Sequence, residues 1–227
     1  MYANPALRPP ILRALRNVVE SQTQVQNQGE ENESEKEESK ENLRYLRGQA
    51  KNWLAVLFNV FASVERGERA QVGEVIGVWA GVAGESELAG AYRSVLGHLN
   101  TSLAGLRSQP KEKEGKVKTA LQMLDILLVL APYLPVVQKA EVVDVVVRGG
   151  VLDVSDGAVQ KVGMRLVGRL VDLGGEGVLT SVGGVGELLE RLAAVEGRGT
   201  TSGGKVRVPS PLYAGGCINR VRRTDCH

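Results

Sequence analysis

The sequence predicts an all-α protein: a HEAT- or armadillo-like α-solenoid of about four helical hairpins over residues 1–197. Three observations lead to this fold class. Apolar residues recur at helical spacing in about eight segments of the chain. The third and fourth hairpins begin about 40 residues apart, which is typical of HEAT and armadillo units. Each pair of segments has apolar residues on both sides, so neighbouring hairpins must stack to bury them.

The composition is that of a folded chain. Of its 227 residues, 43% are hydrophobic and 24% are charged, and the net charge of +2 argues against wrapping nucleic acid along the whole length. The most hydrophobic segment, "ILLVLAPYLPVVQ", is too short for a membrane span and contains two prolines, so we expect core packing and no membrane contact. The start, "MYANPALRPP", lacks the apolar stretch of a secretory signal. Cys217 and Cys226 do not make a disulfide framework, which favours a reducing compartment.

The first hairpin is predicted from two helical stripes. Pro9 and Pro10 precede the first stripe and indicate a helix start. Residues 21–41 are polar and acidic, so we expect a disordered insert there. The second stripe lies in "LRGQAKNWLAVLFNVFASV" and is made by Trp53, Leu54, Val56, Leu57, Val60, Phe61 and Val64. Phe58 lies off this face and is expected to contact a second neighbour, and Trp53→Ala is expected to cost about 3–5 kcal/mol.

The second hairpin joins "ERAQVGEVIGVWAGVAG" to "ESELAGAYRSVLGHLNTSLAGL". Gly73, Gly77 and Gly81 recur every fourth residue in its first helix. They form a ridge where another element can approach closely, at a cost of up to about 1 kcal/mol of helix propensity for each glycine. Residues 107–115 are predicted to be a charged loop.

The third and fourth hairpins complete the predicted array. "VKTALQMLDILLVLAPYL" is apolar nearly all round, as a central helix should be. "PVVQKAEVVDVVVRGG" fits either a strand or a short helix. Ser155 or Asp156 is expected to cap the next helix, and "GVLTSVGGVGELLERLAAVEG" is expected to form the last one. Residues 198–227 have no period and are expected to be an irregular, disordered basic tail.

No enzymatic, metal or cofactor site is expected. Gly199, Gly204 and Lys205 have the spacing of a P-loop, but Val206 stands where the magnesium-binding hydroxyl should be. Cys217, Cys226 and His227 could supply three metal ligands, whereas structural zinc takes four. His98 is expected to be an ordinary helical histidine. Asp125 is expected to be an exposed polar flank rather than a buried paired carboxylate.

Three groups of cations are candidates for contacting RNA or a partner protein, because such groups can hold phosphates without reading bases. The first lies on the first helix, the second precedes the Trp53 face and the third belongs to the charged loop. The residues are Arg8, Arg13, Arg16, Arg44, Arg47, Lys51, Lys111 and Lys113.

Four blocks of the chain resemble one known family. "NPALRPPILRAL", "LRGQAKNWLAVLFNVFASV", "EVIGVWAGVAGESELAGAY" and "MLDILLVLAPYL" look like consecutive blocks of the ribosomal RNA-processing protein 12 family, over about residues 4–171. The blocks are expected to come from within a longer array. The resemblance implies a HEAT-repeat protein of nucleolar pre-ribosomes with roles in pre-rRNA processing and nuclear export of ribosomal subunits.

The implied partners are pre-ribosomal particles, pre-rRNA, assembly factors, Ran and nucleoporins, and the implied location is the nucleus and nucleolus. The function expected from the resemblance is that of a non-catalytic scaffold. The alternative is a karyopherin-like transport adaptor that binds Phe-Gly nucleoporins or Ran.

Overall fold

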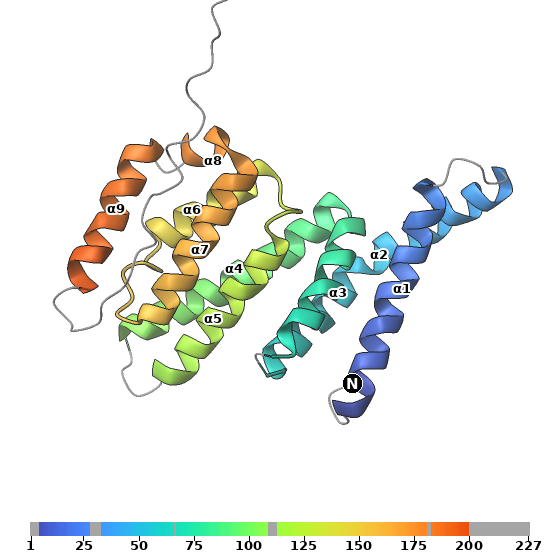
Figure 1. Ribbon diagram of the computed structural model, residues 1–227, viewed down its shortest axis with the longest axis horizontal. Helices are drawn as coiled ribbons and strands as arrows, with labels where there is room; N and C mark the ends of the chain where they lie inside the picture. Colours follow the sequence, from blue (N-terminus) through green and yellow to red (C-terminus); the bar gives the residue numbers. More distant parts are fainter. Residues whose placement is uncertain (1–4, 28–32, 66, 109–112, 181–182, 200–227) are drawn as a thin grey trace, which may run out of the picture.

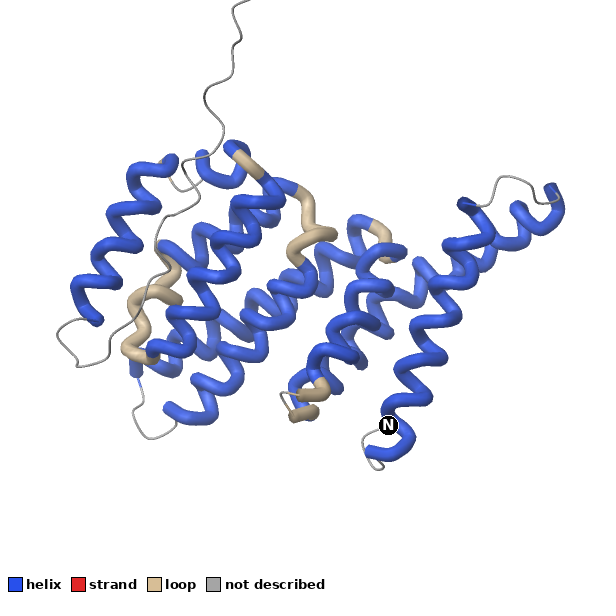
Figure 2. The backbone as a smooth tube through the Cα atoms, viewed as in Figure 1, coloured by secondary structure: helices blue, strands red, loops and turns tan. Residues whose placement is uncertain are grey.

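The computed structural model describes residues 5–27, 33–65, 67–108, 113–180 and 183–199. All regular structure in these ranges is helical (Figure 2). The elements are a 3₁₀ helix η1 (Pro5–Leu7) and the α-helices α1 (Arg8–Asn27), α2 (Glu33–Ser63), α3 (Arg69–Val82), α4 (Glu85–Ser108), α5 (Lys113–Leu130), α6 (Val136–Val147), α7 (Gly157–Gly174), α8 (Glu176–Leu179) and α9 (Gly184–Gly199).

The helices follow one another along an extended stack, from α1 at one end to α9 at the other (Figure 1). The odd-numbered helices form one layer, in which α1 packs on α3, α3 on α5 and α5 on α7. In the other layer α2 packs on α4. The predicted all-α solenoid is therefore confirmed.

After the first hairpin, the pairing of the helices differs from the expected one. The first expected pair is present, because α1 packs along α2. The most extensive packing between consecutive helices nevertheless joins α2 to α3 and α4 to α5, and α6 also packs along α7. By contrast, α3 and α4, and likewise α5 and α6, share few close backbone approaches. Helical periodicity marks the apolar faces of a helix but does not say which neighbour each face meets, so the second and third pairs were assigned one helix away from the observed ones.

The prediction of a disordered acidic insert at residues 21–41 is wrong for the described part of that segment. Helix α1 continues to Asn27 and α2 begins at Glu33, whereas residues 28–32 lie outside the described residues. Ser39 is buried, and its hydroxyl donates a hydrogen bond to the Gln22 carbonyl at 3.0 Å. Glu, Gln and Lys are good helix formers, so a polar segment continued from a packed helix can remain helical.

The other loop and tail predictions also need adjustment. Helix α5 already begins at Lys113, so the charged loop expected at 107–115 is shorter, and residues 109–112 lie outside the described residues. The last predicted helix is broken into α8 and α9, with φ of +83° at Gly183 and +90° at Gly184. Glycine adopts this region readily, which explains the break. Helix α9 runs to Gly199, and the tail from residue 200 onward lies outside the described residues.

The ambiguous valine-rich segment is the helix α6, because it lies between helices and packs on α7 and α8. Buried side chains form a continuous core along the stack. Among the largest fully buried ones are Trp79 of α3, Tyr92 of α4 and Leu127 of α5. No helix in the described ranges has the length and apolarity that crossing a membrane requires.

Asp156 caps α7, as one of the two residues expected to do so. Its Oδ1 accepts hydrogen bonds from the backbone N–H groups of Ala158, at 3.0 Å, and Val159, at 3.1 Å. We expect Asp156→Ala to lower the free energy of unfolding by about 1 kcal/mol, because these two donors lose their partner. Urea unfolding followed by circular dichroism measures the loss. Asp156→Asn keeps an acceptor and should retain most of the stability; equal losses for the two variants would contradict the cap.

Candidate partner interface

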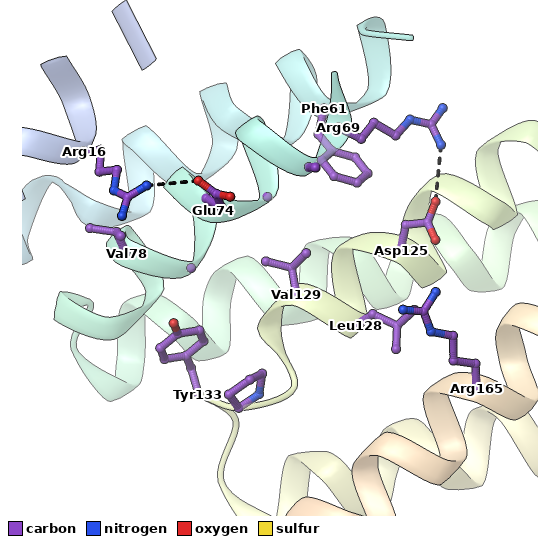
Figure 3. Close-up of a pocket in the computed structure, with 14 residues that line it drawn as sticks. Arg16, Phe61, Arg69, Glu74, Val78, Asp125, Leu128, Val129, Tyr133 and Arg165 are labelled. Carbon is purple, nitrogen blue, oxygen red and sulfur yellow. Dashed lines mark hydrogen bonds and ion pairs between the residues drawn. The ribbon is translucent and has the colours of Figure 1, made fainter. Parts of the chain in front are cut away.

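A groove of about 720 Å³ lies between α3 and α5 on the layer of odd-numbered helices (Figure 3). We call it the α3–α5 groove. Its apolar surface comes from Gly73, Gly77 and Val78 of α3 and from Leu128 and Val129 of α5. Tyr133, in the turn after α5, closes one end. Arg16 of α1 and Arg165 of α7 also line it, so four successive helices of one layer contribute to this surface.

The predicted glycine ridge of α3 is confirmed as a place of close approach. A Cβ atom at Gly77 would lie 3.1 Å from the Tyr133 hydroxyl oxygen, and one at Gly81 would lie 3.3 Å from Tyr133 Cε1. A Cβ atom at Gly73 would lie 3.3 Å from Val129 Cγ2. The three glycines therefore let the end of α5 and the following turn approach the backbone of α3.

Two ion pairs between helices cross the walls of the groove (Figure 3). Arg16 contacts Glu74 of α3 at 3.0 Å and Glu20 of its own helix at 2.7 Å. The hydrogen bond to Glu20 raises the pKa of Arg16. Arg69 of α3 contacts Asp125 of α5 at 3.3 Å. These pairs tie α1 to α3 and α3 to α5, and each engages one of the acidic groups that line the groove.

Asp125 is not the exposed flank that the sequence favoured. Its side chain is half-buried, and its partner Arg69 is 17% exposed. The Arg69 guanidinium carbon also lies 5.6 Å from the centroid of the Phe61 ring, which is within cation–π range. The structure thus favours the alternative of a paired carboxylate, because Asp125 is half-buried and has a cation beside it.

Four of the predicted contact residues form bonds within the array. Besides Arg16, Arg8 contacts Glu68 at 2.7 Å. Arg47 Nε donates to the Val82 carbonyl at 3.3 Å, and Lys113 Nζ donates to the Ser155 hydroxyl at 3.0 Å. Each of these bonds joins segments far apart in sequence, which gives the side chains a structural role.

The remaining candidates are not gathered into one surface. Arg13 lies on α1, Arg44 and Lys51 lie on α2, and all three are exposed. They form no ion pair with any residue in the described ranges. Lys111 lies outside the described residues.

A basic stripe on α7 was missed by the sequence analysis. Lys161, Arg165 and Arg169 are exposed and recur every fourth residue, so they share one helix face. No ion pair joins them to another described residue. Arg165 extends toward Leu128 and lines the α3–α5 groove (Figure 3). Arg165 also lines an adjoining hollow, together with Arg169 and Asp172. We call Lys161, Arg165 and Arg169 the α7 stripe; their spacing of four residues was the signal that the sequence offered.

Of the residues considered for metal or catalytic chemistry, His98 and Asp125 lie in the described ranges, on α4 and α5. No three His, Cys, Asp or Glu side chains in those ranges lie close enough to hold a metal ion. His98 is exposed, with its Nδ1 2.7 Å from the Ser94 carbonyl of its own helix. The residues of the P-loop-like segment after Gly199, and the group Cys217, Cys226 and His227, lie outside the described residues.

Comparison with known proteins agrees with the helical array. The family model described as ribosomal RNA-processing protein 12, HEAT repeats, matches residues 1–64. A curated relative, ribosomal RNA-processing protein 12 of Saccharomyces cerevisiae, is 26% identical over 180 residues, which cover 76% of this chain and 14% of the relative. No solved structure matches the chain. The chain is therefore similar to the ribosomal RNA-processing protein 12 family, at its start by the family model and over most of its length by this relative.

Proposed function

We propose that the chain acts in ribosomal RNA processing as a non-catalytic HEAT-repeat scaffold that docks on pre-ribosomal particles. The observation that carries this proposal is the alignment with ribosomal RNA-processing protein 12 over 76% of the chain. The helical array agrees with that alignment. The chain spans 14% of that relative's length, so the activity of the whole relative is part of the proposal. Nuclear and nucleolar location, export of ribosomal subunits, and contact with assembly factors, Ran and nucleoporins are further parts, which rest on the family resemblance.

The mechanism that we propose is the presentation of side chains at fixed positions. Stacked helices contact only their neighbours and hold exposed residues at regular intervals along a layer. Ion pairs such as Arg8–Glu68 and Arg16–Glu74 lock neighbouring helices in register. The α7 stripe would then contact the phosphates of pre-rRNA, since its three cations are exposed and point from one helix face.

The proposed function is tested by co-purification. The full chain, carrying an affinity tag, is expressed in eukaryotic cells, and the recovered RNA is measured with probes for pre-rRNA spacers. We expect enrichment of pre-rRNA over mature rRNA and over an unrelated tagged helical protein. Equal recovery of pre-rRNA with the chain and with the unrelated protein would overturn the proposal.

A charge-reversal variant tests the RNA contact itself. We expect Lys161→Glu, Arg165→Glu and Arg169→Glu together to weaken binding of single-stranded RNA to the purified chain. Because about 0.7 counterions are released for each phosphate contact with a single strand, the slope of log K against log salt should become shallower by about 2. Fluorescence anisotropy over a series of salt concentrations measures the slope.

The matched control reverses three exposed cations elsewhere, with Arg13→Glu, Arg44→Glu and Lys118→Glu. The control makes the same change in net charge on α1, α2 and α5, and should leave the slope nearly unchanged. If the control lost RNA binding and the α7 variant kept it, the contact would lie with Arg13, Arg44 or Lys118 and not with the α7 stripe.

A further inference from the structure

A second hollow, of about 480 Å³, lies between α2 and α4 with α5 beneath it. We call it the α2–α4 groove. Phe58 lines it and is half-buried, so the off-stripe aromatic of α2 does meet the second neighbour that the sequence predicted. The volume is in the range of pockets that hold small ligands or single large side chains.

The lining of this groove is mainly apolar. Small residues of α2 and α4 leave the space open: Ala55, Gly90 and Ala91. Phe58, Val95 and Met123 supply larger apolar walls. The side-chain amide of Gln122, also in the lining, donates to the Ala62 carbonyl at 2.6 Å, so it is satisfied within the array. A leucine or phenylalanine side chain placed here would remove apolar surface from water on both sides.

The polar groups of the lining are placed along the groove and include no carboxylate. Lys51 reaches over α4, where its Cε lies 4.0 Å from the position of a Cβ at Gly90, and it forms no ion pair with a described residue. His98 is two turns further along α4. Because a carbonyl can only accept, His98 Nδ1–H donates to Ser94 and Nε2 remains for a partner. Asn59 is exposed along the groove.

We propose that the α2–α4 groove binds a short, extended, acidic segment of a partner protein. One large apolar side chain of that segment enters between Phe58, Val95 and Met123, and a neighbouring carboxylate lies beside Lys51. The Asn59 amide, which can donate and accept, pairs with the peptide backbone. From Gly90 to His98 the groove runs about 12 Å, the length of about four extended residues.

The chemistry of the lining favours a peptide over nucleic acid. Binding of a phosphate backbone requires several cations, whereas this groove has one lysine and a mainly apolar lining. The contact is separate from the α7 stripe, because the two surfaces share no residue. Peptide binding and RNA binding can therefore fail independently.

The test uses the purified full chain and fluorescein-labelled hexapeptides in an anisotropy titration. Four peptides have Leu, Ile, Phe or Trp between pairs of Asp and Glu residues. Two controls replace the apolar residue by Ser, or the acidic residues by Lys. We expect saturable binding for at least one of the four peptides and for neither control. The absence of saturable binding for all four would overturn the proposal.

Variants then locate the bound peptide. Lys51→Glu reverses the charge and Ala55→Phe fills the groove from an exposed position, and each should weaken binding about tenfold or more. Lys161→Glu makes the same charge change on α7 and should bind as the unaltered chain does. Thermal melts of all variants should coincide. Unchanged affinity in both groove variants would overturn the proposal. It would also be overturned if an oligouridylate displaced the peptide and Ala55→Phe abolished binding of that oligouridylate, because the groove would then bind RNA.

Discussion

Trp79→Ala is expected to lower the free energy of unfolding by about 3–5 kcal/mol, the largest single loss in the array. Trp79 is 1% exposed and lies in α3, where its ring meets that of Trp53 on α2. Its ring centroid is 5.7 Å from that of Trp53, with the planes tilted by 36°, a geometry typical of favourable aromatic pairs. Truncation removes this pair and leaves a cavity that α2 and α3 cannot collapse around. Urea unfolding followed by circular dichroism measures the loss.

The structure moves this expectation from Trp53 to Trp79, because Trp53 is only half-buried. Trp53→Ala should therefore cost clearly less than Trp79→Ala, although both variants remove the same ring pair. Trp79→Phe is a second control. It deletes the Trp79 indole N–H, which is buried with no hydrogen-bond acceptor among the described residues. Because this unpaired donor is removed, the loss in free energy of unfolding should be smaller than the lost ring area suggests. Equal losses for Trp53→Ala and Trp79→Ala would contradict the assigned burial.

The elements of the fold were predictable wherever a local pattern determined them. Apolar stripes located α3, α4 and α7, a segment apolar nearly all round located α5, and Asp156 marked the start of α7. The polar segment around Ser39 was misjudged, because composition alone does not reveal that its hydroxyl bonds to Gln22 across the hairpin. The same limit explains the pairing of the helices, since periodicity gives the direction of an apolar face and not the partner that covers it.

The candidate contact surface was predictable only in part, for a related reason. The sequence gives the positions of cations, but the acidic partners of Arg8 and Arg16 lie 60 and 58 residues away, at Glu68 and Glu74. Arg16 has a local partner as well, Glu20 four residues on, but nothing local reveals the contacts with Glu68 and Glu74. The α7 stripe is different, because its spacing is local and its exposure follows from the apolar face opposite. A repeated spacing on one helix face is thus more informative in this chain than cations taken one at a time.

Gly163→Ala is expected to destabilise the protein by about 1–2 kcal/mol, although alanine is the better helix former. Gly163 is buried in α7, where a Cβ atom would lie 2.7 Å from Val151 Cγ1 and 3.3 Å from Val146 Cγ1. Valine methyl groups are held close to the backbone and cannot swing away, so α7 would have to move from α6 and from the segment that joins them. This overpacking should exceed the gain in helix propensity of up to about 1 kcal/mol.

Gly168→Ala in the same helix is the matched control. No heavy atom lies within 4 Å of a Cβ atom placed there, so only the gain in propensity remains, and the free energy of unfolding should rise by about 0.5–1 kcal/mol. The two substitutions make the same chemical change five residues apart, and their effects should have opposite sign in urea unfolding. A stabilising Gly163→Ala would mean that α7 does not pack as closely on α6 and its following turn as the structure places it, because only a looser contact leaves room for the methyl group.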